Sequence, residues 1–216
     1  GGRFIINLLT RGVRVRILAR HAERIASRPW GPCVEVVEGD LASPAAMEES
    51  VDGMDAAFYL VHSMTSGRGF RQLDRQMALQ FARAGRGLKR VIYLGGILAE
   101  GPGVSEHLLS RAEVGFILRE SLPTLEFRAG PIIGAGSASF EMVRYLTERV
   151  PLMVAPKWIH TPVQSIGIRD MLDYLVAGLD SDRTGVMNVG AEPLRFRDMI
   201  EQYAAIRDLK RIILPL

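Results

Sequence analysis

Two glycines at the start of the sequence stand where a phosphate-binding turn would place them. Gly1 and Gly2 lead into RFIINLLTRG, whose apolar residues recur at helical spacing. A helix N-terminus presents free N–H groups to an anion, and glycine lets the pyrophosphate approach the backbone closely. The strand and glycines that should precede this turn are absent, so we expect the chain to begin partway through it.

The end of the next predicted strand distinguishes two kinds of ribose. Apolar residues alternate over residues 13–19, and Arg20 follows, with Arg24 one helical turn further on. A carboxylate at such a tip hydrogen-bonds a ribose 2′-hydroxyl, whereas arginine accommodates a 2′-phosphate. Because no carboxylate stands here, the sequence predicts NADP over NAD. The alternative is that both arginines are ordinary surface residues.

A carboxylate also closes the strand predicted at residues 34–37. The sequence there continues Glu38-Gly39-Asp40-Leu41. Asp40 would accept a hydrogen bond from the adenine amino group, and Leu41 would pack beside the ring. Asp40 could instead cap the helix that follows.

The apolar run at residues 55–61 predicts a buried strand whose end carries a histidine. Leu60, Val61 and His62 would pass beside the adenosine ribose and the pyrophosphate. His62 has the chemistry of a general base, and a hydrogen-bonded loop histidine is the alternative.

Strand and helix patterns alternate along the chain with short connections. The predicted helices cover residues 45–51, 70–84, 105–121, 140–149, 170–179 and 197–207, and the strands residues 13–19, 34–37, 55–61, 91–94, 124–128 and 185–189. This order predicts an α/β fold, a Rossmann-type doubly wound parallel sheet that lacks its N-terminal strand. We expect one NAD(P)-binding domain over residues 1–216, with a core at 1–130 and a small substrate-side lobe at 131–216. The strand-like run 211–216 suggests truncation at this end as well.

Composition narrows the function class. The 216 residues are 48% hydrophobic, which suits one well-buried domain, and the net charge is +3. Arginines are scattered rather than clustered, so we expect no nucleic-acid partner. No apolar run is long enough for a membrane helix, and a single cysteine, Cys33, fits a reducing, cytoplasmic compartment. The four histidines lack ligand spacing, so no metal is expected.

Several segments together resemble one protein family. They are VRILAR, VEVVEGDL, DAAFYLVHSM, KRVIYLGG, LEFRAGPIIGAGS and NVGAEP. The sequence resembles the atypical short-chain dehydrogenases/reductases, and within them the bacterial NmrA-like and YbjT-like NAD(P)H-binding proteins. The resemblance implies an oxidoreductase that uses a nicotinamide cofactor. In that branch a further C-terminal domain of unknown function often follows the Rossmann domain.

The resemblance also identifies a departure from the family pattern. Typical members carry Tyr-x-x-x-Lys on the helix after the fifth strand, where the tyrosine is the acid/base. Here His107 and Arg111 stand at that spacing on one helical face. His107 would be the catalytic acid/base, and Arg111 would hold the ribose or a phosphate. The alternative is that both are surface residues on a helix that has lost its chemistry.

The loop after residue 128 is dense in glycine and proline. In similar proteins this loop runs under the nicotinamide, which implies cofactor contacts by Pro131 and Ile132; a plain turn is the alternative. Further candidates for a substrate cleft are Glu141, Met142, Tyr145, Trp158 and Gln164, although methionine and tryptophan are more often packing residues.

These residues favour an NADPH-dependent oxidoreductase acting on a small-molecule substrate. The absence of Tyr-x-x-x-Lys favours an alternative, a non-catalytic NADP(H)-binding redox sensor or scaffold. Epimerase chemistry on sugar nucleotides ranks last, because it would also need the tyrosine.

Overall fold

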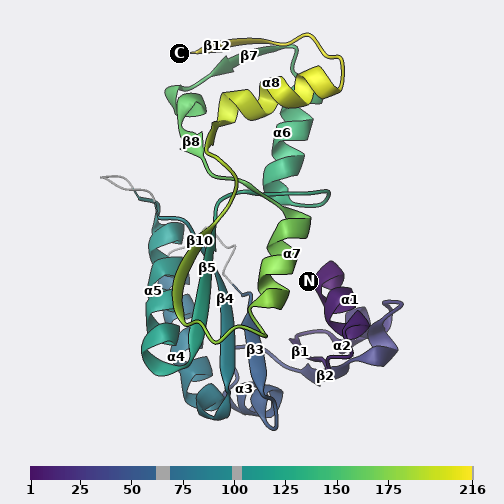
Figure 1. Ribbon diagram of the computed structural model, residues 1–216, viewed down its shortest axis with the longest axis vertical. Coiled ribbons are helices and arrows are strands. Elements are labelled where there is room, and N and C mark those ends of the chain that lie inside the picture. The colour runs from purple at the N-terminus through teal and green to yellow at the C-terminus, as the bar shows by residue number, and fades with distance from the viewer. Residues whose placement is uncertain (62–68, 99–103, 216) are drawn as a thin grey trace. The chain divides into compact units, whose positions relative to one another are not determined.

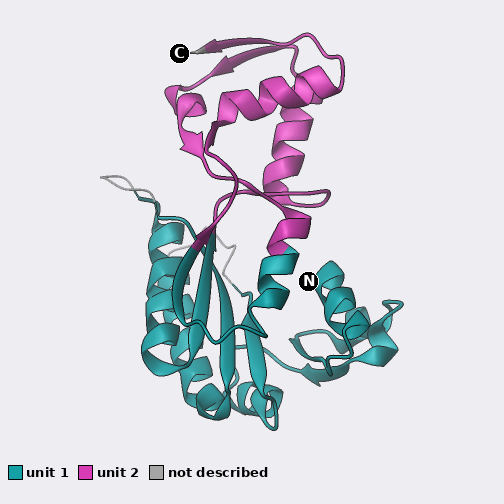
Figure 2. Ribbon diagram, in the orientation of Figure 1, with its two compact units in different colours: residues 1–128, 172–187 teal, residues 129–171, 188–216 magenta. Residues whose placement is uncertain are grey.

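The chain divides into two compact units. The structure, a computed structural model, describes residues 1–61, 69–98 and 104–215. One unit comprises Gly1–Arg128 and Leu172–Met187, and the other Ala129–Met171 and Asn188–Leu216 (Figure 2). The first boundary falls two residues before the one expected at 130. Residues 172–187 belong to the first unit, because they include most of a helix and strand that pack on its sheet.

The first unit holds the alternating elements (Figure 1). Its helices and strands are, in chain order, α1 (Gly2–Thr10), β1 (Arg16–Ala19), α2 (Ala22–Ala26), β2 (Glu35–Glu38), α3 (Pro44–Val51), β3 (Ala56–Tyr59), α4 (Phe70–Ala84), β4 (Arg90–Gly96), α5 (Glu106–Ser121) and β5 (Thr124–Ala129). Helix α7 (Ile168–Ala177) and strand β10 (Gly185–Val189) each belong partly to this unit. The predicted elements are therefore present, with ends shifted by a few residues.

The strands form two groups. β1 pairs with β2 in parallel, with Arg16 opposite Glu35, and a second sheet has the order β10-β5-β4-β3. β3 runs parallel to β4, with Ala56 opposite Arg90. A doubly wound sheet has one further strand between β1 and β3, and a cavity of about 520 Å³ lies between them here.

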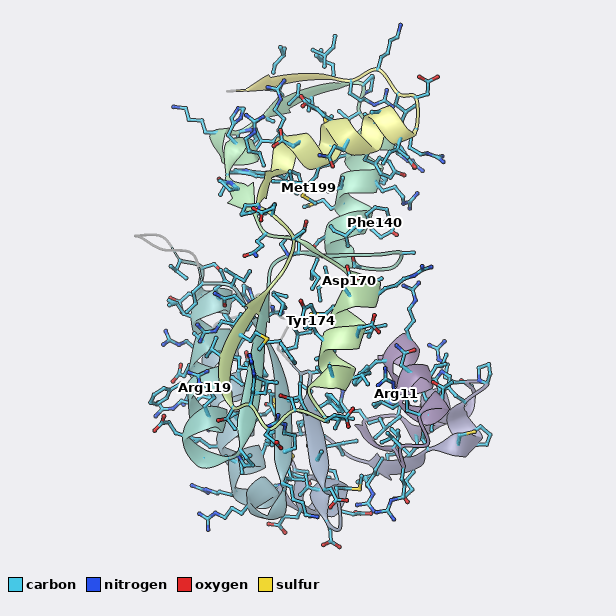
Figure 3. The ribbon with its side chains drawn as sticks, viewed as in Figure 1. Arg11, Arg119, Phe140, Asp170, Tyr174 and Met199 are labelled. Atoms are coloured by element: carbon cyan, nitrogen blue, oxygen red, sulfur yellow. The ribbon has the colours of Figure 1, made fainter. Side chains whose placement is uncertain are left out.

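Helices cover both faces of the sheet. On one face Tyr59 and Tyr93 pack with residues of α3, α4 and α5 in a single buried cluster. On the other face Phe58 meets Phe4 of α1, and Phe127 meets Tyr174 of α7, whose ring is labelled in Figure 3. Coverage of both faces makes this unit a Rossmann-type α/β fold, as predicted.

Local sequence signals explain where the helices begin. Ser43 caps α3 by accepting a hydrogen bond from the Ala46 N–H, and Pro44 occupies the first helical position. Ser105 caps α5 in the same way, through the Leu108 N–H. These helices begin where the cap signals predict.

A buried carboxylate lies between β5 and α5. The Glu126 side chain is 1% exposed, and it forms ion pairs with Arg119 and, at 2.7 Å, with Nε of Arg128. A β-carbon on Gly115 would lie 2.4 Å from one of its carboxylate oxygens, and one on Gly95 would lie 2.8 Å from the other. The two glycines therefore provide the space that the carboxylate occupies. Figure 3 labels Arg119 on α5.

The second unit contains more regular structure than predicted. Its remaining elements are β6 (Ile132–Ile133), α6 (Ala138–Arg149), β7 (Leu152–Ala155), β8 (Pro162–Val163), β9 (Ile166–Gly167), β11 (Leu194–Arg195), α8 (Phe196–Ile206) and β12 (Ile212–Pro215). No strand is predicted between residues 149 and 170, yet β7 lies there and pairs in parallel with β12, some 60 residues later in the chain. The core of this unit packs α6 and α8 against the inner side of these two strands.

A helix that crosses a membrane must be long and apolar. Among the described helices none is both long and apolar enough to do so.

The space around Glu126 gives a stability prediction. Gly115→Ala should destabilise the protein by about 1–3 kcal/mol, since the new β-carbon would collide with the Glu126 carboxylate. In an exposed helix the same change would stabilise by about 0.5–1 kcal/mol. Urea unfolding measures the difference. Gly87→Ala, where nothing lies within 4 Å of the new carbon, is the control. A Gly115→Ala protein as stable as the control would contradict the packing described.

Candidate functional site

The carboxyl ends of parallel strands share one edge of a sheet, which is where ligands bind in this kind of fold. Arg20 follows β1, and Gly39 and Asp40 follow β2. Leu60 and Val61 follow β3. Arg20, Asp40, Leu60 and Val61 therefore follow strand ends, whereas Gly1 and Gly2 stand at the start of α1 and Arg111 lies within α5.

The cavity between β1 and β3 brings four of these residues together. Its lining includes Gly1, Leu41, Leu60 and Val61, and apolar side chains of α1 and α3. Arg20 and Asp40 are not among its lining residues, which places them beside the cavity rather than in it. The predicted residue His62 lies outside the described residues.

The start of α1 supplies backbone donors. Gly1 is the N-cap, and it has no side chain to accept from the first-turn N–H groups. The first turn carries no acidic residue. A β-carbon on Gly2 would lie 3.6 Å from the Trp30 ring, so the indole stands beside this helix end. The arrangement suits an anion, as expected for Gly1 and Gly2.

Asp40 uses one of its two carboxylate oxygens in a hydrogen bond within its own turn. Its Oδ1 accepts from the Ala42 N–H at 2.9 Å, and Ser43 rather than Asp40 caps the helix. Asp40 therefore shapes the turn before α3 without being its N-cap. Within the described part of the chain, no hydrogen bond involves Oδ2, which leaves that atom for the adenine contact predicted above.

His107 and Arg111 contact different elements. The exposed His107 ring stacks on Phe70 at the start of α4, with the ring centroids 4.4 Å apart. Arg111 lies beside the end of β4, where its Nη1 is 3.6 Å from the position of a β-carbon on Gly96. The spacing correctly placed the two residues one turn apart, but the structure does not bring their side chains to one point.

Sequence reasoning missed a tyrosine and an ion-paired arginine near Arg111. The Tyr93 hydroxyl donates to the Arg111 carbonyl at 3.0 Å. Arg128, at the end of β5, donates through Nε to Glu126. No local pattern identifies this group, because its members come from two strands and a helix. In the sequence, the only sign of this group is Arg128 itself, which stands at the end of β5 just before the loop that begins at Gly130.

Pro131, Ile132 and Glu141 belong to the second unit and contact other residues of that unit. The Pro131 carbonyl accepts from Ile166, and Ile132 pairs with Ile166 in β6 and β9. Glu141 forms an ion pair with Arg144 at 2.6 Å, and the Gly136 N–H donates to it.

The other four substrate candidates differ in exposure. Met142 is exposed, and Trp158 is 52% exposed with its ring against Phe196. Gln164 is half-buried beside Gly130 and Gly190. Tyr145 is exposed under the Arg149 guanidinium. Their contacts with a substrate stay a prediction.

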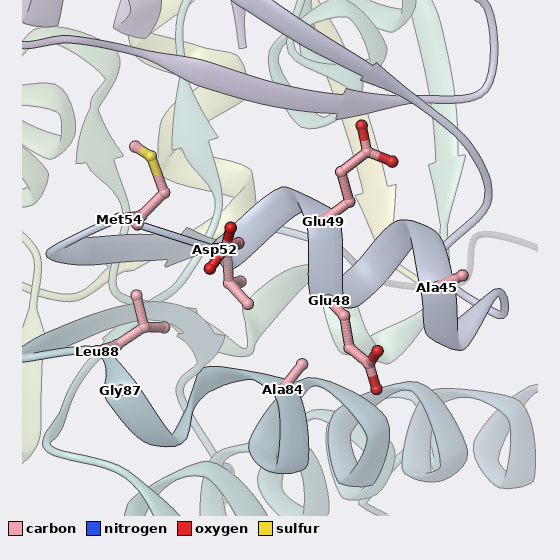
Figure 4. Close-up of a pocket in the computed structure, with 10 residues that line it drawn as sticks. Ala45, Glu48, Glu49, Asp52, Met54, Ala84, Gly87 and Leu88 are labelled. Atoms are coloured by element: carbon pink, nitrogen blue, oxygen red, sulfur yellow. The ribbon is translucent and has the colours of Figure 1, made fainter.

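A second hollow lies at the opposite edge of the sheet. It measures about 690 Å³ and is lined by α3 and the residues just before β3 and β4. Glu48, Glu49 and Asp52 border it, and in Figure 4 the two glutamates point to opposite sides of α3. Its carboxylates would repel phosphates, and it lies at the amino ends of the strands. It is therefore a poor nucleotide site despite its size.

Across residues 1–61, 69–98 and 104–215, no three His, Cys, Asp or Glu side chains lie close enough together to form a metal site.

A family comparison agrees with this geometry. The model of a family described as NAD(P)H-binding matches residues 1–120, more than half of the chain. The chain belongs to the NAD(P)H-binding family. A nicotinamide dinucleotide is thus the cofactor class of this family, and the expected NAD(P)H-binding family and Rossmann-type fold are confirmed. The narrower NmrA-like assignment stays a prediction.

One curated relative shares part of the chain. It is a (4-alkanoyl-5-oxo-2,5-dihydrofuran-3-yl)methyl phosphate reductase of Streptomyces griseus, 31% identical over 110 residues. The match covers 51% of this chain and 36% of the relative, so the chain spans about a third of that protein's length.

Solved structures show the same fold. A short-chain dehydrogenase/reductase superfamily protein from Agrobacterium tumefaciens with bound NAD has a TM-score of 0.74 and 17% identity, over 100% of this chain and 81% of its own. DesIV, a dTDP-glucose 4,6-dehydratase from Streptomyces venezuelae, has a TM-score of 0.76 and 14% identity over the same shares. At these identities the likeness concerns the fold alone.

Buried tyrosines of this NAD(P)H-binding unit give a prediction about pH. Burial raises the pKa of both Tyr59 and Tyr93 above the ordinary value for a phenol. The unfolded chain ionises these phenols from about pH 10, while the folded protein keeps them protonated. The free energy of unfolding should therefore be unaffected below about pH 10. It should fall by up to ~1.4 kcal/mol per pH unit for each tyrosine above that.

Urea unfolding across this pH range measures the effect, and phenolate absorbance identifies the groups. Tyr93→Phe should leave the native absorbance titration unchanged and remove one phenolate from the titration in denaturant. Loss of a phenolate from the native titration below pH 10 would show that Tyr93 ionises in the fold.

Proposed function

We propose that this protein is an NADPH-dependent oxidoreductase of the atypical short-chain type that acts on a small organic molecule. The observation that carries the NADPH preference is the position of Arg20. It is exposed directly after β1, and no hydrogen bond or ion pair involves its guanidinium in the described part of the chain. A free arginine at this tip suits a 2′-phosphate.

The neighbouring carboxylate does not compete for this role. Glu38 closes β2 opposite Ala19, and its Oε1 accepts from the Ala22 N–H at 3.3 Å. It is thus held against the start of α2. The carboxylate that would bind a ribose 2′-hydroxyl in an NAD enzyme has no counterpart at the end of β1 itself.

Two observations support reductase chemistry. The curated relative that the chain resembles over 110 residues is named as a reductase. In such proteins the nicotinamide carries the hydride, and the protein binds and orients both molecules. Arg111 of α5, beside the end of β4, and Arg128 of β5 are available for that orientation.

A second function has its own supporting observation. His107 and Arg111 replace the tyrosine and lysine of the family, and the His107 ring is engaged by Phe70. A protein that binds NADP(H) without turnover, as a redox sensor or scaffold, would need neither residue to reach a substrate.

The cofactor preference is tested at Arg20. Arg20→Asp should weaken NADPH binding about 10- to 100-fold, because charge-assisted hydrogen bonds to the 2′-phosphate contribute about 1.5–3 kcal/mol. NADH has no such phosphate, so its affinity should change little. Calorimetric titration of both dinucleotides measures the two affinities.

Arg86→Asp is the matched control, since it makes the same charge change at an exposed residue just before β4, at the amino edge of the sheet. Equal losses for NADPH and NADH in Arg20→Asp would rule out a contact with the 2′-phosphate.

Catalysis is tested at His107. If His107 is the acid/base, His107→Ala should lower NADPH turnover with carbonyl or enone substrates by about 10²- to 10⁴-fold and leave NADPH affinity intact. Phe70→Leu, which removes the stacked ring and keeps the histidine, separates loss of chemistry from loss of packing. Dinucleotide binding without turnover by the unaltered protein on a broad carbonyl panel would favour the sensor.

A further inference from the structure

Three arginines and one carboxylate lie along α5 and β5, beside β4. Arg111 and Arg119 come from α5, and Arg128 and Glu126 come from β5. Glu126 is fully buried and forms ion pairs with Arg119 and Arg128. The group therefore holds an excess of positive charge close to the protein interior.

This excess is costly without a further anion. Burial, followed by the neighbouring charge of Arg128, lowers the pKa of Arg119, which means that the cations disfavour one another. Arg128 is only 18% exposed in its side chain. Glu120 also acts on Arg119, so the positive charge with least compensation is that of Arg111 and Arg128. Partly buried cations are stabilised by an opposite charge.

Two of the guanidinium groups have donors to spare. Arg128 uses only Nε in its contact with Glu126, so both of its Nη atoms lack a hydrogen bond within the described residues. In the same part of the structure the Arg111 guanidinium makes no hydrogen bond or ion pair. The paired N–H groups of a guanidinium match the geometry of a phosphate or carboxylate.

Both guanidinium groups can be located relative to the end of β4. Arg111 Nη1 lies 3.6 Å from the β-carbon position of Gly96, and the Glu126 oxygen that accepts from Arg128 lies 2.8 Å from that of Gly95. Both arginine charges also act on the hydroxyl of Tyr93. The β-carbon positions of the two glycines are filled by Glu126 and Leu108, so a side chain at either position would displace its neighbour.

We propose that Arg111 and Arg128 together bind an oxyanion, a phosphate monoester or a carboxylate, of the second substrate. The proposal rests on the proposed function, in which the dinucleotide is the first ligand. Glu126 is a positioning residue here: it fixes Arg128 from the buried side and leaves its Nη atoms toward the ligand.

The cofactor's own pyrophosphate is a less suitable occupant. It belongs at the start of α1, which packs through Phe4 on the Phe58 side of the sheet. Arg111 and Arg128 lie on the α5 side, and β4 separates β5 from β3. With strands about 4.8 Å apart, β3 and β5 are about 10 Å from each other. The oxyanion site is thus a separate place.

Inorganic phosphate is the probe. Titration of phosphate into the full chain, followed by calorimetry and by phosphorus NMR line width, should show saturable binding in the presence of NADPH. Arg111→Gln should weaken it about 10-fold or more, and Arg111→Gln with Arg128→Lys should abolish it, because charge-assisted contacts are lost. Arg83→Gln, an exposed residue at the far end of α4, is the control and should have no effect.

Arg111 has no polar side-chain partner in the described residues, so the Arg111→Gln protein should fold normally. The test therefore remains valid even if the double variant does not fold. Equal phosphate binding by the unaltered protein and Arg111→Gln would overturn the proposal. So would a matching loss of NADPH affinity, since the arginines would then hold the dinucleotide. Phosphate binding that depends on Arg111 in a protein that binds no dinucleotide would retain the oxyanion site and refute the proposed function.

Discussion

The parallel direction of the strands is the constraint on which the first unit depends. Parallel neighbours cannot be joined by a tight turn, so the chain must return across a face of the sheet before the next strand begins. Helix α4 makes that return between β3 and β4, and their register sets Ala56 opposite Arg90. Each return also aligns the carboxyl ends at one edge. Residues that are far apart in sequence, such as Arg20 and Asp40, therefore collect where a dinucleotide can meet them.

A second constraint follows from burying charge beneath that edge. The Glu126 carboxylate lies between a strand and a helix, where it would be destabilising without partners. Arg119 and Arg128 neutralise it, and Gly95 and Gly115 leave it space. Five residues from two strands and one helix thus form one interdependent group. A buried network of this kind fixes the orientation of Arg128 at the site more firmly than an exposed ion pair would.

Sequence patterns predicted the elements whose signals are local. The α4 helix spans the predicted 70–84, and α3, which Ser43 caps, covers the predicted 45–51 with one further residue at its start. Strand β7 was missed because its partner β12 lies at the far end of the chain, and no local pattern reports such a pairing. The strand at 13–19 is shorter than its alternation suggests: β1 begins at Arg16 and is half-buried throughout. The Glu126 group escaped notice for the same reason as β7, since its members meet only in the folded sheet.

Dinucleotide binding and catalysis make different demands on this edge of the sheet. In the proposed function, dinucleotide binding uses backbone N–H groups at the start of α1 as well as side chains such as Arg20. Catalysis depends on one or two side chains at a reacting atom, and here the position of the family tyrosine is a histidine stacked on Phe70. The fold can therefore retain the cofactor whichever chemistry it performs. What separates a reductase from a sensor is whether a second molecule is held against the nicotinamide. Under the proposal above, Arg111 of α5 and Arg128 of β5 would hold it.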